Sequence, residues 1–474
     1  MTPVRPATSM ATLLGPWLAE QRWYVAKGYD VAPPERLGGL RLVEDDGRVG
    51  VEVHLVAVRG ADGVPVTYQV PLSYHTVEQP HLAHALVGRF DHPDLGVRWI
   101  YDGPHDLVFV QALLRLLDGG EATSARGAGG PLDEEDPPTA RAVGVRQRVA
   151  PPPSGPAQVL RGEQSNTSII VDRDGPDPMI VKLFRVLQPG TNPDVVVQSR
   201  LAAGGCERVP HPVGWIEGTW AAPDGVTVTG HLAYACEFVP DGEDAWRVAC
   251  AAVERGKPFD DAARALGATT AQVHTALAVA LPTRPVDAAV LARLADGLAA
   301  RVGWAVSTAP VLGPFAAAAL EAVDAVRGMS GLPDLQQVHG DYHLGQVLHS
   351  PRRGWIVLDF EGEPLRPLAE RLEPDLALRD VAGMLRSFDY AARHATIGLA
   401  PSDPAATAAA EWSRRARESF LAGYAEAGGR IGSPVLLRAL ELDKALYEVV
   451  YETLNRPAWV PIPLAALDRL ATPA

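Results

Sequence analysis

The sequence predicts an α+β fold of two lobes, a strand-rich N-terminal lobe and a mostly helical C-terminal lobe. Alternation of apolar and polar residues, broken by turn signals, recurs up to residue 239. After Ala245 the chain is rich in Ala and Leu and has helical periodicity, over residues 262–281, 288–304 and 315–326. A chain of 474 residues is long enough for two or three domains. We therefore expect an N-terminal subdomain, an intermediate subdomain of strands and a helical lobe, over residues 1–105, 106–239 and 240–474.

Composition excludes several classes of function. A net charge of −14 leaves no basic excess to neutralise a nucleic-acid backbone. No run of 18 or more apolar residues predicts a membrane span, and the first residues lack the apolar core of a secretory signal. Three irregularly spaced cysteines, Cys206, Cys236 and Cys250, fit neither a disulfide framework nor a zinc site. We expect a protein of the reducing cytoplasm that binds neither nucleic acid nor membrane.

The first hundred residues are predicted to form a unit of their own. Residues 13–22 have the pattern of a short helix, and residues 50–58 and 64–71 that of two strands joined by a turn at 61–63. Four residues of the first strand are expected on one face: Val51, Val53, Leu55 and Ala57. Residues 119–158, rich in Gly, Pro and acids, are predicted to be a linker without function.

A lysine on a hairpin marks the intermediate subdomain. Two apolar stretches, 168–171 and 179–184, are joined by a turn at 173–176, and Lys182 lies in the second. Kinases cover ATP phosphates with such a hairpin and bind them with its lysine. Small polar residues precede the hairpin where glycines would be expected, and we assign them to the phosphates: Ser165, Asn166, Thr167 and Ser168. The alternative is that Lys182 is a solvated strand residue.

The stretch 232–239 is predicted to be a strand that ends where Pro240 begins a break. Such a strand is typical of the connection between two kinase lobes. The backbone of Glu237 and Val239 is then expected to bind an adenine edge. The alternative is an ordinary edge strand.

The most informative motif lies at residues 338–361. It places Asp341, then Gln346 five residues later, then Asp359 at the end of an apolar run. Protein kinases use an acid, an amide and a second acid in this order: the first acid accepts the proton of the attacking hydroxyl, and the other two groups hold magnesium. We expect Asp341 to be the catalytic base and Gln346 and Asp359 to bind Mg²⁺. Each fragment alone could be a helix cap or an ordinary strand end.

A helix over residues 441–451 is predicted to contact the second substrate. Lys444, Tyr447 and Tyr451 share one face, with Glu441 one turn earlier, and a cation with two phenols suits a polyhydroxylated ligand. His343, beside the catalytic acid, is assigned to the same substrate. The alternative is that the tyrosines are half-buried packing residues and that Lys444 pairs with Glu441 or Glu448.

A second helix, over residues 378–390, is expected to support the site. Arg379 and Arg386 are predicted to hold acids of neighbouring segments, and Asp380 to cap or anchor the active-site loops.

The chain resembles bacterial maltokinases, within the aminoglycoside-phosphotransferase-like branch of the protein-kinase-like superfamily. The resemblance implies an N-terminal cap subdomain, an ATP-binding subdomain and a helical lobe. It also implies ATP and Mg²⁺ as cofactors, and maltose as the acceptor of a phosphate that yields maltose 1-phosphate for α-glucan synthesis from trehalose. A cytoplasmic monomer, with possible association with a trehalose/maltose isomerase, is expected. The segments that carry the resemblance are 21–24, 163–168, 181–185, 190–194, 338–348, 358–364, 379–388, 441–448, 455–457 and 461–464.

One departure from the maltokinase pattern affects the lysine. Val196 stands where family members carry a glutamate that pairs with it, so Asp194 or another acid must replace that partner, or Lys182 works unpaired. Two alternatives to maltose phosphorylation stay open. One is a kinase of another sugar, such as glucosamine, although a Lys444 face disfavours a cationic substrate; the other is a catalytically weak regulatory partner of a maltose-producing isomerase.

Overall fold

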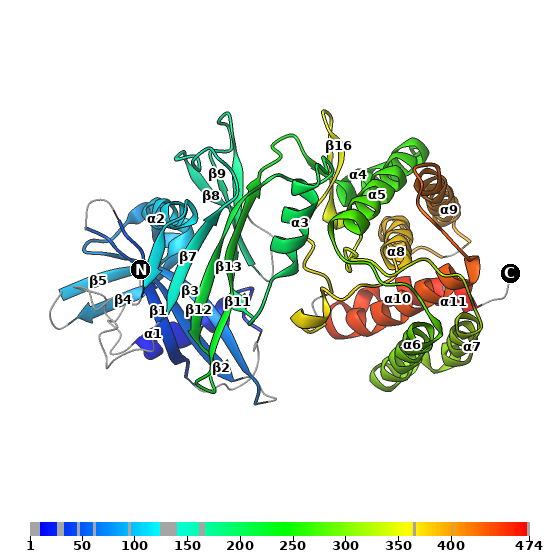
Figure 1. Ribbon diagram of the computed structural model, residues 1–474, viewed down its shortest axis with the longest axis horizontal. Helices are drawn as coiled ribbons and strands as arrows, with labels where there is room; N and C mark the ends of the chain where they lie inside the picture. Colours follow the sequence, from blue (N-terminus) through cyan, green and yellow to red (C-terminus); the bar gives the residue numbers. More distant parts are fainter. Residues whose placement is uncertain are drawn as a thin grey trace. The chain divides into compact units, whose positions relative to one another are not determined.

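The computed structural model describes residues 10–25, 33–44, 48–59, 63–92, 96–123, 140–160, 166–363, 366–400 and 402–471. The chain divides into two compact units. The strand unit comprises Met1–Val195 and His211–Pro240, and the helical unit comprises Val196–Pro210 and Asp241–Ala474. Figure 1 shows the strands of the first unit in blue to green and the helices of the second in green to red. The predicted α+β class, strand-rich first and helical second, is confirmed.

The strand unit is built on one antiparallel sheet in the order β4-β5-β3-β2-β1-β6-β7-β12-β13-β10-β9-β8, with β11 paired to β3. Its helices are α1 (Met10–Glu20) and α2 (Leu107–Leu117), with short 3₁₀ turns at Pro80–Ala85 and Gly103–His105. The strands are β1 (Glu35–Arg41), β2 (Gly50–Arg59), β3 (Pro65–His75), β4 (Leu86–His92), β5 (Gly96–Asp102), β6 (Glu121–Thr123), β7 (Arg141–Arg146), β8 (Ala157–Val159), β9 (Asn166–Val171), β10 (Met179–Phe184), β11 (Val186–Leu187), β12 (Pro212–Ala221) and β13 (Thr227–Glu237).

Alternation along β2 separates two cores. Its odd-numbered apolar residues, Val51 to Ala57, pack in one cluster with α2, as predicted for one face of a strand. Val56 and Val58 pack on the other side, with Trp23. Both faces of this strand are therefore buried. Most of the predicted turn at 61–63 lies outside the described residues.

The predicted linker over residues 119–158 is wrong for β6, β7 and β8. β7 pairs with β6 on one side and with β12 on the other. Its inward positions carry small residues because α2 lies directly against them: a Cβ on Gly144 would come within 1.7 Å of the carbonyl oxygen of Leu116. A strand that buries Ala142 and Gly144 has little hydrophobic signal, which is why its sequence resembles a loop. Residues 124–139 lie outside the described residues.

The helical unit contains the three predicted helices as α5, α6 and α7, with bounds that differ from the predicted ones by at most four residues. The long helix α10 packs against α6, α7, α8 and α11, while α9 packs along α5. A small sheet, β14-β15-β16, carries the motif region. The elements are α4 (Ala245–Glu254), α5 (Asp260–Ala280), α6 (Ala288–Thr308), α7 (Ala316–Arg327), α8 (Leu378–His394), α9 (Pro404–Glu426), α10 (Pro434–Asn455), α11 (Pro461–Ala471), β14 (Glu243–Asp244), β15 (Val347–Ser350) and β16 (Gly354–Val357). Among the described residues, no helix combines the length and apolarity needed to cross a membrane.

Candidate active site

Lys182 on β10 has an acidic partner. Its Nζ lies 3.2 Å from Oδ2 of Asp194, in the first turn of α3 (Pro193–Ala203). Asp194 is 2% exposed, and its N–H donates to Oδ1 of Asn192 at 2.9 Å, as at a helix N-terminus. The lysine is therefore paired, and Asp194 takes the place of the acid that is missing at Val196.

The register between β9 and β10 shows which of the polar residues before the lysine lie on the same face of the hairpin as Lys182. Ser168 is directly opposite Lys182, whereas Thr167 is opposite Leu183. Because successive side chains of a strand point to opposite faces, Ser168 shares the face of Lys182 and Thr167 does not. The Thr167 hydroxyl instead accepts a hydrogen bond from Nε of Arg185 at 2.8 Å. The Thr167 hydroxyl is thus engaged on the face away from Lys182, and the assignment of Thr167 to the phosphates stays a prediction.

The remaining nucleotide assignments stay predictions. Asn166 lies on the lysine face of β9 and is buried, and Ser165 lies outside the described residues. At the end of β13, the N–H of Glu237 donates to the carbonyl of His211 at 2.8 Å. Because that N–H is already engaged, the carbonyl of Glu237 and the N–H of Val239 are the backbone groups that we assign to adenine.

The segment that carries Asp341 is anchored from α8. Asp380, which is 2% exposed, accepts from the N–H of His339 at 2.8 Å and from that of Gly340 at 2.9 Å. His274 lies 2.9 Å from the same carboxylate. Gly340 has a φ of 87°, which favours glycine over the arginine found in protein kinases. The predicted anchoring role of Asp380 is confirmed.

His339 joins the two halves of the motif. Its Nε2 lies 2.8 Å from the carbonyl of Leu358, and its Nδ1 accepts from the N–H of Asp341 at 3.3 Å. These contacts place the ring proton on Nε2, because a carbonyl can only accept. The ring also packs against Phe360 at a centroid distance of 4.8 Å. The imidazole of His339 thus holds Asp341 beside the segment that ends in Asp359.

Gln346 and Asp359 are brought together by the hairpin between them. The N–H of Leu358 donates to the carbonyl of Gln346 at 2.9 Å, so the residues on either side of β15 and β16 are neighbours. Asp359 has a φ of 62°, a conformation that non-glycine residues adopt rarely and often at functional sites. Glu361, half-buried, follows two residues later. Carboxylate and amide oxygens are the ligands that Mg²⁺ prefers, so this donor set fits the predicted metal.

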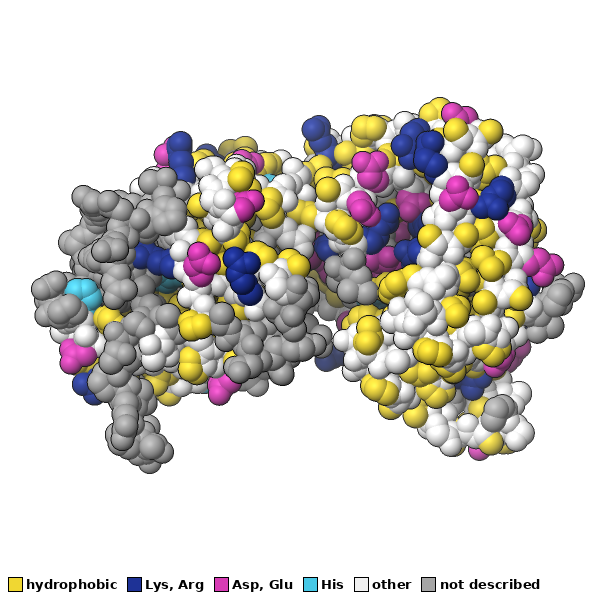
Figure 2. All heavy atoms as spheres, turned by 90° about the horizontal axis from the view of Figure 1, so that it is seen from below, with side chains coloured by type: hydrophobic (Ala, Val, Ile, Leu, Met, Phe, Trp, Pro, Cys, Tyr) yellow, Lys and Arg dark blue, Asp and Glu magenta, His cyan; other side chains and the backbone are white. Residues whose placement is uncertain are grey.

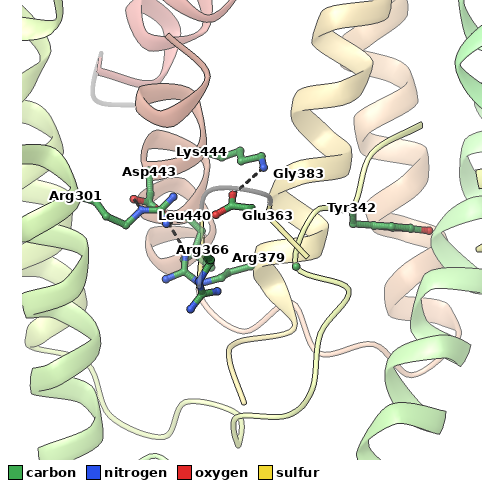
Figure 3. Close-up of a pocket in the computed structure, with 10 residues that line it drawn as sticks. Arg301, Tyr342, Glu363, Arg366, Arg379, Gly383, Leu440, Asp443 and Lys444 are labelled. Atoms are coloured by element: carbon green, nitrogen blue, oxygen red, sulfur yellow. Dashed lines mark hydrogen bonds and ion pairs between the residues drawn. The ribbon is translucent and has the colours of Figure 1, made fainter. Parts of the chain in front are cut away.

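Lys444 on α10 contacts Asp341, the predicted base. Its Nζ lies 3.2 Å from Oδ1 of Asp341 and 3.0 Å from Oε1 of Glu363. Burial alone would lower the pKa of this ammonium, but the two carboxylates outweigh that effect and raise it. Figure 3 shows Lys444 pointing toward Glu363 within the pocket. The lysine is therefore a fixed cation next to the group assigned as base.

One expectation about α10, and part of the alternative to it, are wrong. Glu441 does not join the face of Lys444: its carboxylate is buried and binds Arg417 at 2.9 Å. Nor does Lys444 pair with Glu441 or Glu448, since Glu448 accepts from Arg386 at 2.8 Å. Helical spacing places Glu441, Lys444 and Glu448 one or two turns apart on α10. The arginines that α8 and α9 bring against α10 bind the two glutamates instead.

A polar pocket opens beside Lys444. Arg301 on α6 donates to Asp443 at 2.8 Å, and Arg379 donates to the other oxygen of Asp443 at 2.9 Å. Figure 2 shows acidic and basic side chains gathered together on one face of the helical unit. The predicted role of Arg379 in holding an acid is confirmed. The residues that line the pocket are Arg301, Gly340, Tyr342, Glu363, Arg366, Arg379, Gly383, Leu440, Asp443 and Lys444.

Aromatic rings continue from this pocket along α10. Tyr447 and Tyr451 are stacked at a centroid distance of 6.4 Å, and the Lys444 ammonium lies 5.0 Å from the Tyr447 ring. Trp304 on α6 lies 6.4 Å from Tyr447 and is 41% exposed. His343 lies beside the acid, with Nε2 3.9 Å from Oδ2 of Asp341. The three predicted residues of α10 thus share a face, and the tyrosines are half-buried, which fits both a contact with substrate and a packing role.

Sequence reasoning missed two residues of this site. Arg301 has no signal, because it is one arginine in an Ala-rich helix that meets Asp443 from 142 positions away. Glu363 lies in the segment 358–364 that carries the family resemblance, so its pattern was visible although its role was not.

The ion pair of Glu363 predicts a pH dependence of stability. Burial opposes ionisation, but Lys444 and Arg301 outweigh it and lower the pKa of Glu363 from 4.5 to about 2. A carboxyl group whose pKa is lower in the folded state than in the unfolded state stabilises the fold at pH values above the unfolded pKa. This stabilisation is lost as the pH falls through the folded pKa. Between pH 4.5 and pH 2, the melting temperature should fall more steeply for the natural protein than for Glu363→Gln. Parallel melting curves for the two proteins across this window would contradict the pairing.

A hairpin lysine paired with an acid on α3, and an acid–amide–acid motif held by Asp380, define a kinase-like phosphotransferase. A family model of the maltokinase N-terminal cap domain matches residues 17–106. A glucosamine kinase of Mycolicibacterium smegmatis is 33% identical over 343 residues, which cover 66% of this chain and 81% of that protein. A glucosamine kinase of Streptacidiphilus jiangxiensis is 30% identical over 325 residues, covering 65% and 72%.

Solved structures share the fold. A glucosamine kinase crystal form aligns with a TM-score of 0.63 at 24% identity, covering 98% of this chain and 100% of that one. A glucosamine kinase in complex with glucosamine, ADP and inorganic phosphate aligns with a TM-score of 0.59 at 24% identity, covering 99% and 100%. The chain belongs to the family of maltokinase-type, kinase-like sugar phosphotransferases that includes these glucosamine kinases. At the level of reaction class it is a sugar kinase.

Proposed function

We propose that the protein transfers the γ-phosphate of ATP to the anomeric hydroxyl of maltose, giving maltose 1-phosphate. The observation that supports a neutral sugar is the position of Lys444, whose ammonium occupies one oxygen of Asp341 and one of Glu363. An amino sugar would bring a second cation to carboxylates that already hold one. A neutral disaccharide brings hydroxyls, which can accept from Lys444 and donate to Asp341. As the resemblance implies, the product would feed α-glucan synthesis from trehalose.

In this proposal each unit has its own role. Lys182, held by Asp194, binds the ATP phosphates from the strand unit. In the helical unit Asp341 accepts the proton of the sugar hydroxyl, and Lys444, whose Nζ lies 3.2 Å from Oδ1 of Asp341, holds the carboxylate in position. Gln346 and Asp359 would hold Mg²⁺, which neutralises charge on the phosphates when bound.

The acceptor helix gives a testable contact. If Tyr447 stacks on a sugar ring, Tyr447→Ala should raise the maltose KM while the ATP KM stays nearly constant. Loss of one such contact should cost on the order of 1–3 kcal/mol of binding, which is about a 5- to 150-fold rise in KM. Tyr24→Ala, a change of the same size in the strand unit, is the control for general destabilisation. An unchanged maltose KM with an earlier melting temperature would make Tyr447 a packing residue.

Phosphorylation of glucosamine is the second candidate, because two relatives at 33% and 30% identity are glucosamine kinases. Calorimetric titration of each sugar into the protein, in the presence of a non-hydrolysable ATP analogue, separates the candidates. We expect heat of binding from maltose and none from glucosamine. Binding of glucosamine alone would favour the second candidate.

A further inference from the structure

Arg185 lies at a buried junction within the strand unit. It is the first residue after β10, three positions beyond Lys182, and its side chain is 1% exposed. Its guanidinium donates from Nη2 to both oxygens of Asp102, each at 2.8 Å. The guanidinium also lies 4.7 Å from the Trp23 ring. Asp102 and Trp23 both belong to the stretch that matches the cap domain, so a single cation joins the cap to the strand of the candidate ATP lysine.

The same cation reaches the neighbouring strand. Nε of Arg185 donates to the hydroxyl of Thr167 on β9 at 2.8 Å, and Thr167 precedes Ser168, which is opposite Lys182. The guanidinium therefore fixes both strands of the hairpin against the cap. Its position determines how β9 and β10 lie relative to Asp102.

Backbone contacts from β3 of the cap surround this junction. The N–H of Gln69 donates to the carbonyl of Arg185 at 2.8 Å. The side-chain amide of Gln69 donates to the carbonyls of Phe184 and Leu232, each at 2.9 Å. β11, which follows Arg185 directly, pairs with β3. The cap thus contacts the end of β10 and the middle of β13.

Stability alone is a weak reason for this arrangement. Burying an ion pair removes two charges from water, and apolar residues of similar volume often stabilise as well or better. Nη1 of Arg185 is also buried without a hydrogen-bond partner among the described residues, which adds to the cost. A bidentate, directional contact does fix an angle and a distance, which apolar packing fixes less well.

We propose that Arg185 is a positioning residue for ATP, through which the cap holds Ser168 and Lys182 in the geometry that binds the triphosphate. This inference rests on the proposed role of Lys182 and goes beyond it, because it makes the cap part of the nucleotide-binding apparatus. Loosening the junction should weaken binding of the phosphates and leave binding of the nucleoside unchanged, since the adenine assignment lies at the end of β13, where Glu237 is hydrogen-bonded to His211 and not to the junction.

Two variants of the full-length protein loosen the junction in different ways. Asp102→Asn keeps the shape of the side chain and removes its charge, and Thr167→Val removes only the bond to β9. The matched control is Asp106→Asn. Asp106 is an equally buried cap carboxylate, but its contacts, His75 at 2.7 Å and the N–H of Val108 at 3.0 Å, lie within the cap and α2.

The measurements are the Kd values of Mg·ATP and of adenosine, with the melting temperature of each variant. We expect both junction variants to weaken ATP binding about 10- to 100-fold, because misplacement of a functional group by about 1 Å can cost about 100-fold. Adenosine binding should stay within about twofold of the natural protein's, and Asp106→Asn should melt earlier with both affinities kept. The double variant should lose little more than the worse single one, because both act through Arg185.

Three results would overturn the inference. One is unchanged ATP affinity in junction variants that melt earlier, which is the behaviour of a merely structural pair. Another is an equal loss for ATP and adenosine. The third is additivity of the two changes, which would make Thr167 an independent contact. Failure of the natural protein to bind Mg·ATP would instead contradict the proposed function.

Discussion

Asp341→Asn is expected to reduce turnover by about 10²- to 10⁴-fold, the contribution of a positioned proton acceptor. The side chain keeps its shape, and Lys444 keeps its second partner Glu363, so the acceptor pocket should survive. ATP affinity should stay within a few-fold of the natural value. A coupled assay of ADP release gives the rate, and calorimetry gives the affinity.

The control for this change is Asp324→Asn, on an exposed position of α7, which should leave turnover unaltered. Retention of most activity by Asp341→Asn would remove Asp341 from the role of base. Loss of ATP binding together with turnover would make it a structural residue of the loop.

Asp359→Asn should lose Mg²⁺-dependent nucleotide binding as well as turnover. Asparagine tolerates the left-handed backbone at this position, where φ is 62°, so the substitution removes the charge without adding strain. Changes to groups that merely orient metal ligands cost 10- to 100-fold, so removal of a ligand's charge should cost at least about 100-fold in Mg·ATP affinity. Titration of ATP with and without Mg²⁺ separates the metal contribution from the rest.

The ratio of the ATP affinities with and without Mg²⁺ is compared between Asp359→Asn and the natural protein. If the two proteins have the same ratio, the metal is bound by other ligands. Asp359→Gly, which also accepts this φ, should behave like the asparagine variant. If only one of them loses affinity, backbone geometry rather than the carboxylate is responsible.

The elements of the catalytic motif could be predicted because they are local. Asp341, Gln346 and Asp359 lie on one loop and one hairpin, so their spacing along the chain nearly determines their spacing in space. The helices after Ala245 and the strands β2, β3, β10 and β13 followed from periodicity for the same reason. Alternation along β9 also carried information, and it would have separated Thr167 from Ser168.

Partners brought together by tertiary packing could not be predicted. Arg185 meets Asp102 from 83 positions away, and Lys444 meets Asp341 from 103 positions away. Charged residues are common on helices, and nothing local indicates which of them becomes buried beside an acid. β7 was missed because its buried positions carry small residues, Ala142 and Gly144, which leave room for α2 to pack against the strand. Small residues give little hydrophobic alternation, so the sequence does not show a strand there.

The central claim is that this chain phosphorylates maltose at the anomeric position with ATP. The most direct measurement is ATP consumption by the purified protein with Mg²⁺ and maltose, glucose, glucosamine or trehalose in turn, with each product identified by ³¹P and ¹H NMR. We predict consumption with maltose and a single product that carries phosphate on the anomeric carbon. Phosphorylation of glucosamine without phosphorylation of maltose would contradict the claim.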